Sequence, residues 1–499
     1  MSTIDSKDTG GASPQSSPDN PFEDAARAAP RAGADGLRNA LDYLRALENV
    51  GTPAAPKASI LEMLYMDSIK AIEARLPLLA EMPLPIPSKP RQIIRDMQDV
   101  LEALAALLLT PPETENDEGV PAPARSVSSQ ALWRALRLLS RHLLISSLTA
   151  APPGAGIWRQ LHRVYAQAGR QDVTQSHPEN AAGTLQDEYY AAILLGCAQP
   201  TSFTGREVLF LDTYLERFSE RVDTGGDVPA GSPVTFWIDP ESDAPATPYS
   251  RRPPAPETPV YSFSCGRLAS LLESQLAALE TGTPARQIDL PSFASTDAGL
   301  GVLTRLIHLW GNPGKRRFPR RKQNYRGKLC LGFDNLCQLY GTTPQPAETS
   351  NWMITNESPD GYAVMHLSGK TQAITAGDVA ALRTESGSDW QLCIIRWALS
   401  ENQEHIELGL QILSPRAYTA DIALPGASEA STRRPALVLP ATPSIRPNEG
   451  LVVRSGALAG HPNSFVLVIE RDNIEVREID DIQCDERNGL IELYGIKPR

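Results

Sequence analysis

The sequence predicts a multidomain α + β protein. We expect an N-terminal all-α helical bundle or solenoid-like region, then an antiparallel six-stranded β-barrel, then a small C-terminal β domain. With 499 residues the chain is too long for one ordinary domain. Apolar residues recur with a helical period as far as residue 310. Beyond residue 312 the period falls to two, and turn residues separate short apolar runs.

The composition argues against a general nucleic-acid-binding protein, a secreted protein and a membrane-spanning protein. The formal net charge is −12, whereas a general nucleic-acid-binding protein is basic overall. The N-terminus lacks the apolar segment of a signal peptide, and no run of eighteen apolar residues exists. We therefore expect a cytoplasmic protein without membrane insertion. The six cysteines have no CxxC spacing, which indicates buried thiols in a reducing compartment and neither a disulfide framework nor a zinc site.

The first half of the chain has helical periodicity. Residues 1–20 are rich in Ser, Asp, Gly and Pro, so a disordered tail is expected, followed by a helical domain over 21–222. Ser59 with Glu62 is typical of a capping box that opens a helix. The spacing Trp158-x-x-Leu161-x-x-x-Tyr165 resembles a tetratricopeptide helix, but it occurs once, so an irregular bundle is the preferred interpretation over a repeat array.

The next segment, 223–312, is rich in Gly, Pro, Ser and Asp, and is predicted to be a linker with one strand and two helices. A barrel is predicted for 313–418 and a further β domain for 419–499, which could be a degenerate second barrel. The expected barrel strands are 326–331, 351–355, 362–367, 379–384, 390–398 and 406–413. The expected C-terminal strands are 436–439, 465–470, 474–478 and 490–494.

Two short stretches carry the candidate site. The run from Gly314 to Lys328 is dense in arginine and contains no acid, in a protein that is acidic overall. The second stretch, Asn356 to Gly361, reads as a tight turn with polar side chains. A local basic run beside such a turn suits a small anion that carries a guanine base.

The residue types fit that chemistry. The planar fork of arginine donates two parallel hydrogen bonds to a phosphate or to the guanine O6/N7 edge, and its flat face stacks on a purine. Asn356 offers an amide donor and acceptor, and Ser358 offers a hydroxyl. Gly361 permits a backbone conformation or a close approach that a side chain would block.

In this order the two stretches resemble the signature of PilZ domains, which is RxxxR followed on a later strand by [Asp/Asn]-x-Ser-x-x-Gly. The first element is Arg317-x-x-x-Arg321, preceded by Arg316, although Arg316-x-x-x-Arg320 also fits. The second is Asn356-x-Ser358-x-x-Gly361. Further similar segments are Gly377-Asp378-Val379, Ile395-Arg396-Trp397 and Glu407-Leu408-Gly409-Leu410. The resemblance covers about residues 313–416.

The resemblance implies a six-stranded barrel that binds cyclic di-GMP at its rim. Its site residues would be Arg316, Arg317, Arg321, Asn356, Ser358 and Gly361. The implied function is a cyclic di-GMP receptor that acts on an unknown protein partner through the helical domain, with motility, pilus or biofilm output. No catalytic group, metal site or further cofactor is expected.

Other interpretations stay open at this point. A nucleotide-independent adaptor would use the helical domain for a partner and keep the barrel as structure. RNA or single-stranded DNA binding would need aromatic platforms beside the charge, for which Phe318 and Tyr325 are the candidates, and no specific nucleic acid is expected. The residues between the two motif stretches, 333–350, include an insertion that could reshape the site.

Overall fold

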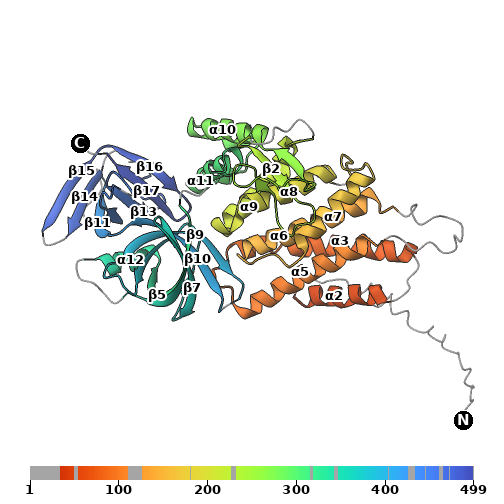
Figure 1. Cartoon of the computed structure of the whole chain (residues 1–499), viewed down its shortest axis with the longest axis horizontal. Helices are drawn as coiled ribbons and strands as arrows, with labels where there is room; N and C mark the ends of the chain where they lie inside the picture. Colours follow the sequence, from red (N-terminus) through yellow and green to blue (C-terminus); the bar gives the residue numbers. More distant parts are fainter. Residues whose placement is uncertain are drawn as a thin grey trace, which may run out of the picture.

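The computed structural model describes residues 34–49, 54–110, 126–179, 181–225, 232–314, 318–341, 347–402, 404–424, 433–443, 445–459, 465–470 and 473–497. A helical region, a closed β-barrel and a C-terminal sheet follow one another along the chain (Figure 1). The barrel and the sheet lie side by side at one end of the molecule, and the helices extend away from them to the other end. The α + β architecture predicted from the sequence is confirmed.

The N-terminal helices pack around α6, whose residues are buried on nearly every side. A helix that is buried all round forms the centre of a bundle. Within it Arg141 is 2% exposed, and its guanidinium donates to Asp212 at 2.6 Å and to Glu216. The helices are α2 (Ala34–Asn49), α3 (Ala54–Glu73), α4 (Leu76–Ala80), α5 (Ser88–Leu108), α6 (Ser129–Leu148), α7 (Ile157–Arg170), α8 (Leu185–Cys197) and α9 (Gly205–Phe218).

Two helix starts have capping boxes, in which Thr184 pairs with Asp187 and Thr204 pairs with Glu207. These boxes satisfy backbone N–H groups that have no partner within the helix. The capping box expected at Ser59 is wrong as a helix start, because α3 already begins at Ala54. Ser59 is therefore an exposed residue within α3 and does not open the helix.

Residues 223–312 pack as part of the helical region, although their composition suggested a linker. Phe236, Phe263, Leu272 and Trp310 belong to the same apolar core as the N-terminal helices. Four short strands form a sheet in the order β1-β4-β2-β3. The elements are β1 (Asp223–Thr224), β2 (Thr235–Ile238), β3 (Thr247–Pro248), β4 (Tyr261–Ser264), α10 (Gly266–Glu280), α11 (Asp297–Leu306) and the π-helical turn η6 (Ile307–Gly311).

The barrel closes with all neighbouring strands antiparallel in the order β10-β7-β6-β5-β8-β9. Alternate residues point inward and fill it, among them Trp352, Val364 and Leu382. Each strand expected from the sequence is present, within five residues at either end. The elements are β5 (Arg321–Leu331), α12 (Phe333–Tyr340), β6 (Thr349–Ser358), β7 (Gly361–Ser368), β8 (Val379–Thr384), β9 (Gln391–Ser400) and β10 (Ile406–Ser414).

The C-terminal residues form a seven-stranded antiparallel sheet in the order β15-β14-β11-β12-β13-β17-β16, with β15 and β16 at its edges, instead of a second closed barrel. One face of this sheet shares an apolar core with the outer face of β8 and β9 and with α12, including Phe333, Ile394 and Leu437. The helix α12, which is the first part of the insertion, therefore packs between barrel and sheet. The strands are β11 (Tyr418–Ala423), β12 (Arg434–Leu439), β13 (Gly450–Arg454), β14 (Phe465–Glu470), β15 (Ile474–Ile479), β16 (Ile482–Arg487) and β17 (Ile491–Ile496).

Main-chain hydrogen bonds join the helical region to the barrel. The Ile374 N–H donates to the Leu84 carbonyl oxygen at 3.0 Å, and the Ser400 N–H donates to the Ala150 carbonyl oxygen at 2.8 Å. Leu84 also packs against the barrel core. This junction contains more main-chain hydrogen bonding and less shared apolar core than the junction between barrel and sheet.

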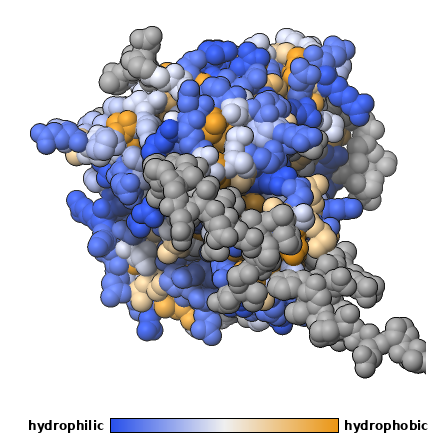
Figure 2. All heavy atoms as spheres, turned by 90° about the vertical axis from the view of Figure 1, so that its right-hand side faces the viewer, coloured by the Kyte–Doolittle hydropathy of each residue, from blue (hydrophilic) through white to orange (hydrophobic). Residues whose placement is uncertain are grey.

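The face at the helical end of the molecule is mostly hydrophilic, with visible hydrophobic residues in small separate spots (Figure 2). Among the described residues, we find no helix with the length and apolar character needed to cross a bilayer. All six cysteines are described and none is paired in a disulfide. Burial raises the pKa of the Cys330 thiol to about 11, which keeps this thiol protonated at neutral pH.

Candidate ligand-binding site

The turn between β6 and β7 forms one wall of the candidate site. The Ser358 hydroxyl donates to Asp360 Oδ1 at 2.6 Å and lies 3.2 Å from the Gly361 carbonyl oxygen. The Ile412 N–H donates to the Asp360 carbonyl oxygen at 2.9 Å, which ties the turn to β10. The turn is therefore held in place from within and from the neighbouring strand.

Gly361 is required by a close backbone approach. A Cβ at this position would overlap the carbonyl oxygen of Leu410 and lie 3.1 Å from the Leu410 carbonyl carbon. The Gly361 backbone itself is outside the left-handed region. Of the two reasons considered for this glycine, the structure therefore shows the close approach.

A bulge at Thr355 decides which side chains of β6 face the site. Ile354 pairs with Val364 and Asn356 with Ala363, so Thr355 is the extra residue. Past the bulge Glu357 continues on the side of the barrel interior, where its carboxylate accepts from Tyr325 at 3.1 Å. Asn356 and Ser358 consequently share the outer face. Burial, together with the hydrogen bond to Glu357, raises the pKa of Tyr325, so its hydroxyl remains a donor.

The same pairing places the arginines. Arg321 lies directly opposite Glu357, and directly opposed residues of an antiparallel pair share a face. Arg321 thus belongs to the Glu357 side, whereas Arg320 lies with Ser358 and Gly361 around a pocket of about 170 Å³, here called the rim pocket. The rim pocket is lined by Phe318, Arg320, Ser358, Asp360, Gly361, Arg396, Trp397, Gly409, Leu410 and Gln411.

The structure therefore brings Ser358 and Gly361 together and leaves Arg321 and Asn356 outside the residues that line the rim pocket. Arg316 and Arg317 lie outside the described residues. Residues 333–341 of the insertion do not line the rim pocket, and 342–346 lie outside the described residues.

Trp397 lines the rim pocket, although the sequence indicated it only as part of the similar segment Ile395-Arg396-Trp397 and not as a site residue. It lies on β9 opposite Gly409 of β10, and a Cβ at Gly409 would overlap the indole Nε1. The missing side chain lets the ring lie across the strand. An aromatic ring on such a wall is a surface on which a purine can stack. The sequence feature that could have indicated this ring is Gly409, a glycine among the apolar residues of β10.

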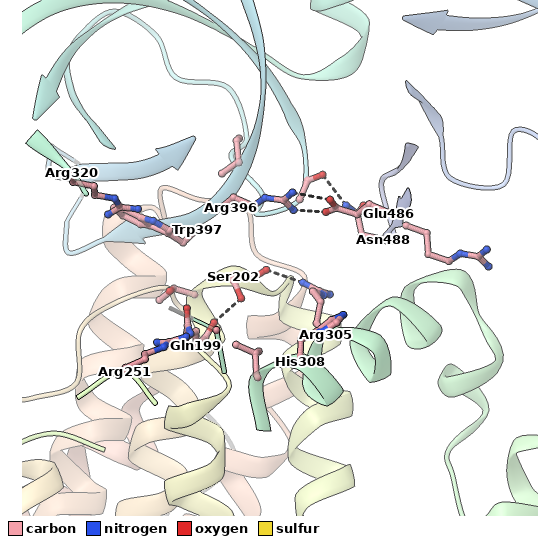
Figure 3. Close-up of a pocket in the computed structure, with 16 residues that line it drawn as sticks. Gln199, Ser202, Arg251, Arg305, His308, Arg320, Arg396, Trp397, Glu486 and Asn488 are labelled. Carbon is pink, nitrogen blue, oxygen red and sulfur yellow. Dashed lines mark hydrogen bonds and ion pairs between the residues drawn. The ribbon is translucent and has the colours of Figure 1, made fainter. Parts of the chain in front are cut away.

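The rim pocket opens beside a larger space, here called the interdomain cavity, of about 1130 Å³. Arg320, Arg396 and Trp397 line both. Figure 3 shows Arg320 and Trp397 together on the barrel side and Gln199 and Arg251 on the opposite, helical side. The cavity is lined by Gln199, Thr201, Ser202, Arg251, Arg305, His308, Leu309, Gly314, Arg320, Gly377, Ile395, Arg396, Trp397, Glu486, Arg487 and Asn488.

Ion pairs hold several of these arginines. The Arg396 guanidinium binds the Glu486 carboxylate of β16 with both terminal nitrogens, Nη2 to Oε2 at 2.8 Å (Figure 3). The Arg396 Nε donates to the Gln411 side-chain oxygen at 2.5 Å. Arg305 donates to the buried Glu207 at 2.6 Å. The lining thus combines many guanidinium groups with few carboxylates, which suits an anionic ligand.

No group of three or more His, Cys, Asp or Glu side chains that could hold a metal ion occurs within the portion of the chain that the structure describes.

A closed six-stranded barrel with this turn and arginine at its rim defines the class: the chain contains a PilZ domain, preceded by a long helical region. Residues 338–418 match the family model described as the middle PilZ domain of the cyclic-di-GMP receptor FimW. Residues 23–227 match the model described as the N-terminal domain of the same receptor. The resemblance stated from the sequence is confirmed.

The chain is also similar to an individual protein. The chain is similar to the cyclic-di-GMP receptor FimW of Pseudomonas aeruginosa, with 20% identity over 392 residues. These residues cover 63% of this chain and 64% of FimW. The matched PilZ segment begins at residue 338, so the arginine run lies ahead of it.

Proposed function

We propose that this protein is a receptor for cyclic di-GMP that passes the signal to a protein partner through its helical region. The observation that carries the proposal is that Arg320 from one motif stretch and Ser358 and Gly361 from the other line one pocket. The likeness to a receptor described as binding cyclic di-GMP supports it.

The residues have distinct roles in this proposal. Arg320 grips a phosphate or the guanine O6/N7 edge, since it can donate two parallel hydrogen bonds. Trp397 stacks on a base. Ser358 and Asn356, which share the outer face of β6, offer polar groups to a base edge. Arg316 lies four residues before Arg320, so these two arginines form one RxxxR motif, and Arg316 is the proposed second arginine of the site. In the alternative register the motif is formed by Arg317 and Arg321.

Calorimetry on the full chain tests the proposal and the register together. Wild type should bind cyclic di-GMP. Arg320→Ala should weaken binding by about 10- to 100-fold, because hydrogen bonds to a charged group are lost. Arg321→Ala is the matched control and should change binding little. The reverse order of the two variants would select the Arg317/Arg321 register. A wild type that stays silent at high ligand concentration would favour the nucleotide-independent adaptor.

The receptor acts without catalysis in this proposal, and we place it in the cytoplasm of a bacterium. Motility, pilus function or biofilm formation is the proposed output. Ligand binding must also raise the melting temperature, because a ligand that binds only the folded state stabilises it by mass action.

A further inference from the structure

The rim pocket is too small to hold a cyclic dinucleotide alone. Its volume is about 170 Å³, whereas ligand pockets usually enclose about 300–1,000 Å³. The adjoining interdomain cavity has about 1130 Å³ and shares Arg320, Arg396 and Trp397 with it. A ligand seated on these shared residues would therefore extend into the interdomain cavity.

Arg251 on the helical side is positioned to meet such a ligand. Its loop is fixed on both flanks, because the Ser250 hydroxyl donates to the Pro313 carbonyl oxygen at 2.8 Å and the Trp237 indole N–H donates to the Arg252 carbonyl oxygen at 2.7 Å. Pro313 lies just ahead of the arginine run. The side chain of Arg251 is exposed and lines the interdomain cavity (Figure 3).

The charge of Arg251 is not balanced by a carboxylate of the described residues. Three other arginines around the cavity differ in this respect, since Arg305 pairs with Glu207, Arg396 with Glu486 and Arg487 with Asp297. A cationic side chain on a fixed backbone that faces a large cavity suits an anionic group of a ligand.

Gln199 lies on the same helical wall in a strained conformation. Its backbone is left-handed, with φ 55° and ψ 62°, although it has a side chain. Such backbone costs of order 1–3 kcal/mol and is concentrated at functional sites. The exposed carboxamide of Gln199 lines the cavity and offers both a donor and an acceptor to a base edge.

We infer that the helical region contributes a second half of the ligand site, in which Arg251 contacts a phosphate of the cyclic dinucleotide and Gln199 contacts a base. The inference rests on the proposed function. It makes the ligand a bridge between the barrel, through Arg320 and Trp397, and the helical region. The ligand then stabilises one arrangement of the two parts.

Calorimetry with cyclic di-GMP on the full-length Arg251→Ala variant tests the inference. We expect a dissociation constant about 10- to 100-fold higher than that of wild type, which corresponds to the loss of hydrogen bonds to a charged group. The matched control is Arg286→Ala. It removes an exposed arginine of the same region that lines none of the cavities described for the structure, and it should bind as wild type does. Both variants should melt within about 1 °C of wild type without ligand, since surface substitutions rarely change stability.

The possible outcomes distinguish failure of the second half-site from failure of the receptor function. Wild-type affinity in Arg251→Ala, together with weakened binding in Arg320→Ala, would overturn the inference and leave the proposed receptor function intact. A wild type that does not bind the dinucleotide would overturn both. Weakened binding in Arg251→Ala and in Arg286→Ala alike would show a general effect of net charge and would also overturn the inference.

Discussion

Replacing Gly361 by alanine tests the geometry of the rim most directly. The new methyl group would overlap the Leu410 carbonyl oxygen and lie 3.1 Å from the Leu410 carbonyl carbon and 3.2 Å from Gln411 Cα. All three atoms belong to the backbone of β10, so no flexible side chain can move aside. Strands β7 and β10 must separate at this point, where Gln411 pairs with Gly361.

The cost follows from two known effects. Overpacking in a well-packed site costs about 1–3 kcal/mol. Loss of a strand hydrogen bond, such as that from the Ile412 N–H to the Asp360 carbonyl oxygen, adds about 1 kcal/mol. Together they predict a local destabilisation of about 2–4 kcal/mol in this corner of the barrel.

Hydrogen exchange measures that quantity where it arises. Amides in β7 and β10 should exchange about 30- to 1,000-fold faster in Gly361→Ala, because local opening becomes easier by 2–4 kcal/mol. Gly169→Ala is the control: it lies in the last turn of α7, an added Cβ would meet no neighbouring atom within 4 Å, and the change should stabilise the helix by at most about 1 kcal/mol. Unchanged protection of β7 and β10 in Gly361→Ala would refute the close approach.

Three further predictions address other parts of the chain. Gln199→Gly should raise the free energy of unfolding by about 1 kcal/mol, because glycine adopts the left-handed backbone without strain, and should weaken ligand binding; lower stability in denaturant unfolding would contradict this. Burial raises the pKa of Asp378 above its ordinary value of 3.8, so the folded state binds more protons and stability falls as pH rises through the window above 3.8. Asp378→Asn should remove this loss in melting curves recorded across that window, and identical pH profiles would count against it. Arg141→Ala should cost about 3 kcal/mol, because the Asp212 and Glu216 carboxylates lose a buried partner, and a melting temperature equal to that of wild type would reject that role.

Two strands have the same bounds in the structure as in the prediction: Val379–Thr384 of the barrel and Phe465–Glu470 of the C-terminal sheet. The first is buried on both faces, and its start was marked by the Gly377-Asp378 turn, whereas the second alternates. The strand Gly450–Arg454 is also buried over most of its length and was not predicted, because a short apolar run has no period of its own. The composition of residues 223–312 wrongly indicated a linker. Their polar and proline-rich stretches separate a few large aromatic residues, and these aromatic residues enter the helical core.

The candidate site was predictable only in part, for a reason of geometry. Ser358 and Gly361 follow from a local turn, which a short motif specifies. Which arginine faces the rim pocket depends on bulges in the paired strands β5 and β6. Each bulge shifts the alternation of side chains by one residue, and such a shift exchanges the faces of Arg320 and Arg321. Arg251 lies about 70 residues ahead of Arg320, and its approach to the barrel is set by the packing of the helical region, which no local pattern encodes.

The distribution of contacts explains why a ligand in the interdomain cavity would act on the helical region. Barrel and C-terminal sheet share an apolar core, so they should move as one body. The helical region meets the barrel through main-chain hydrogen bonds, through polar groups and through the apolar side chain of Leu84; Arg91, for example, donates to the Glu401 carbonyl oxygen at 2.6 Å. A ligand held from both sides adds its free energy to that junction. A 10- to 100-fold loss of affinity in Arg251→Ala would correspond to about 1.4–2.7 kcal/mol, which is the size of ordinary allosteric couplings, and by linkage the same free energy would favour the docked helical region.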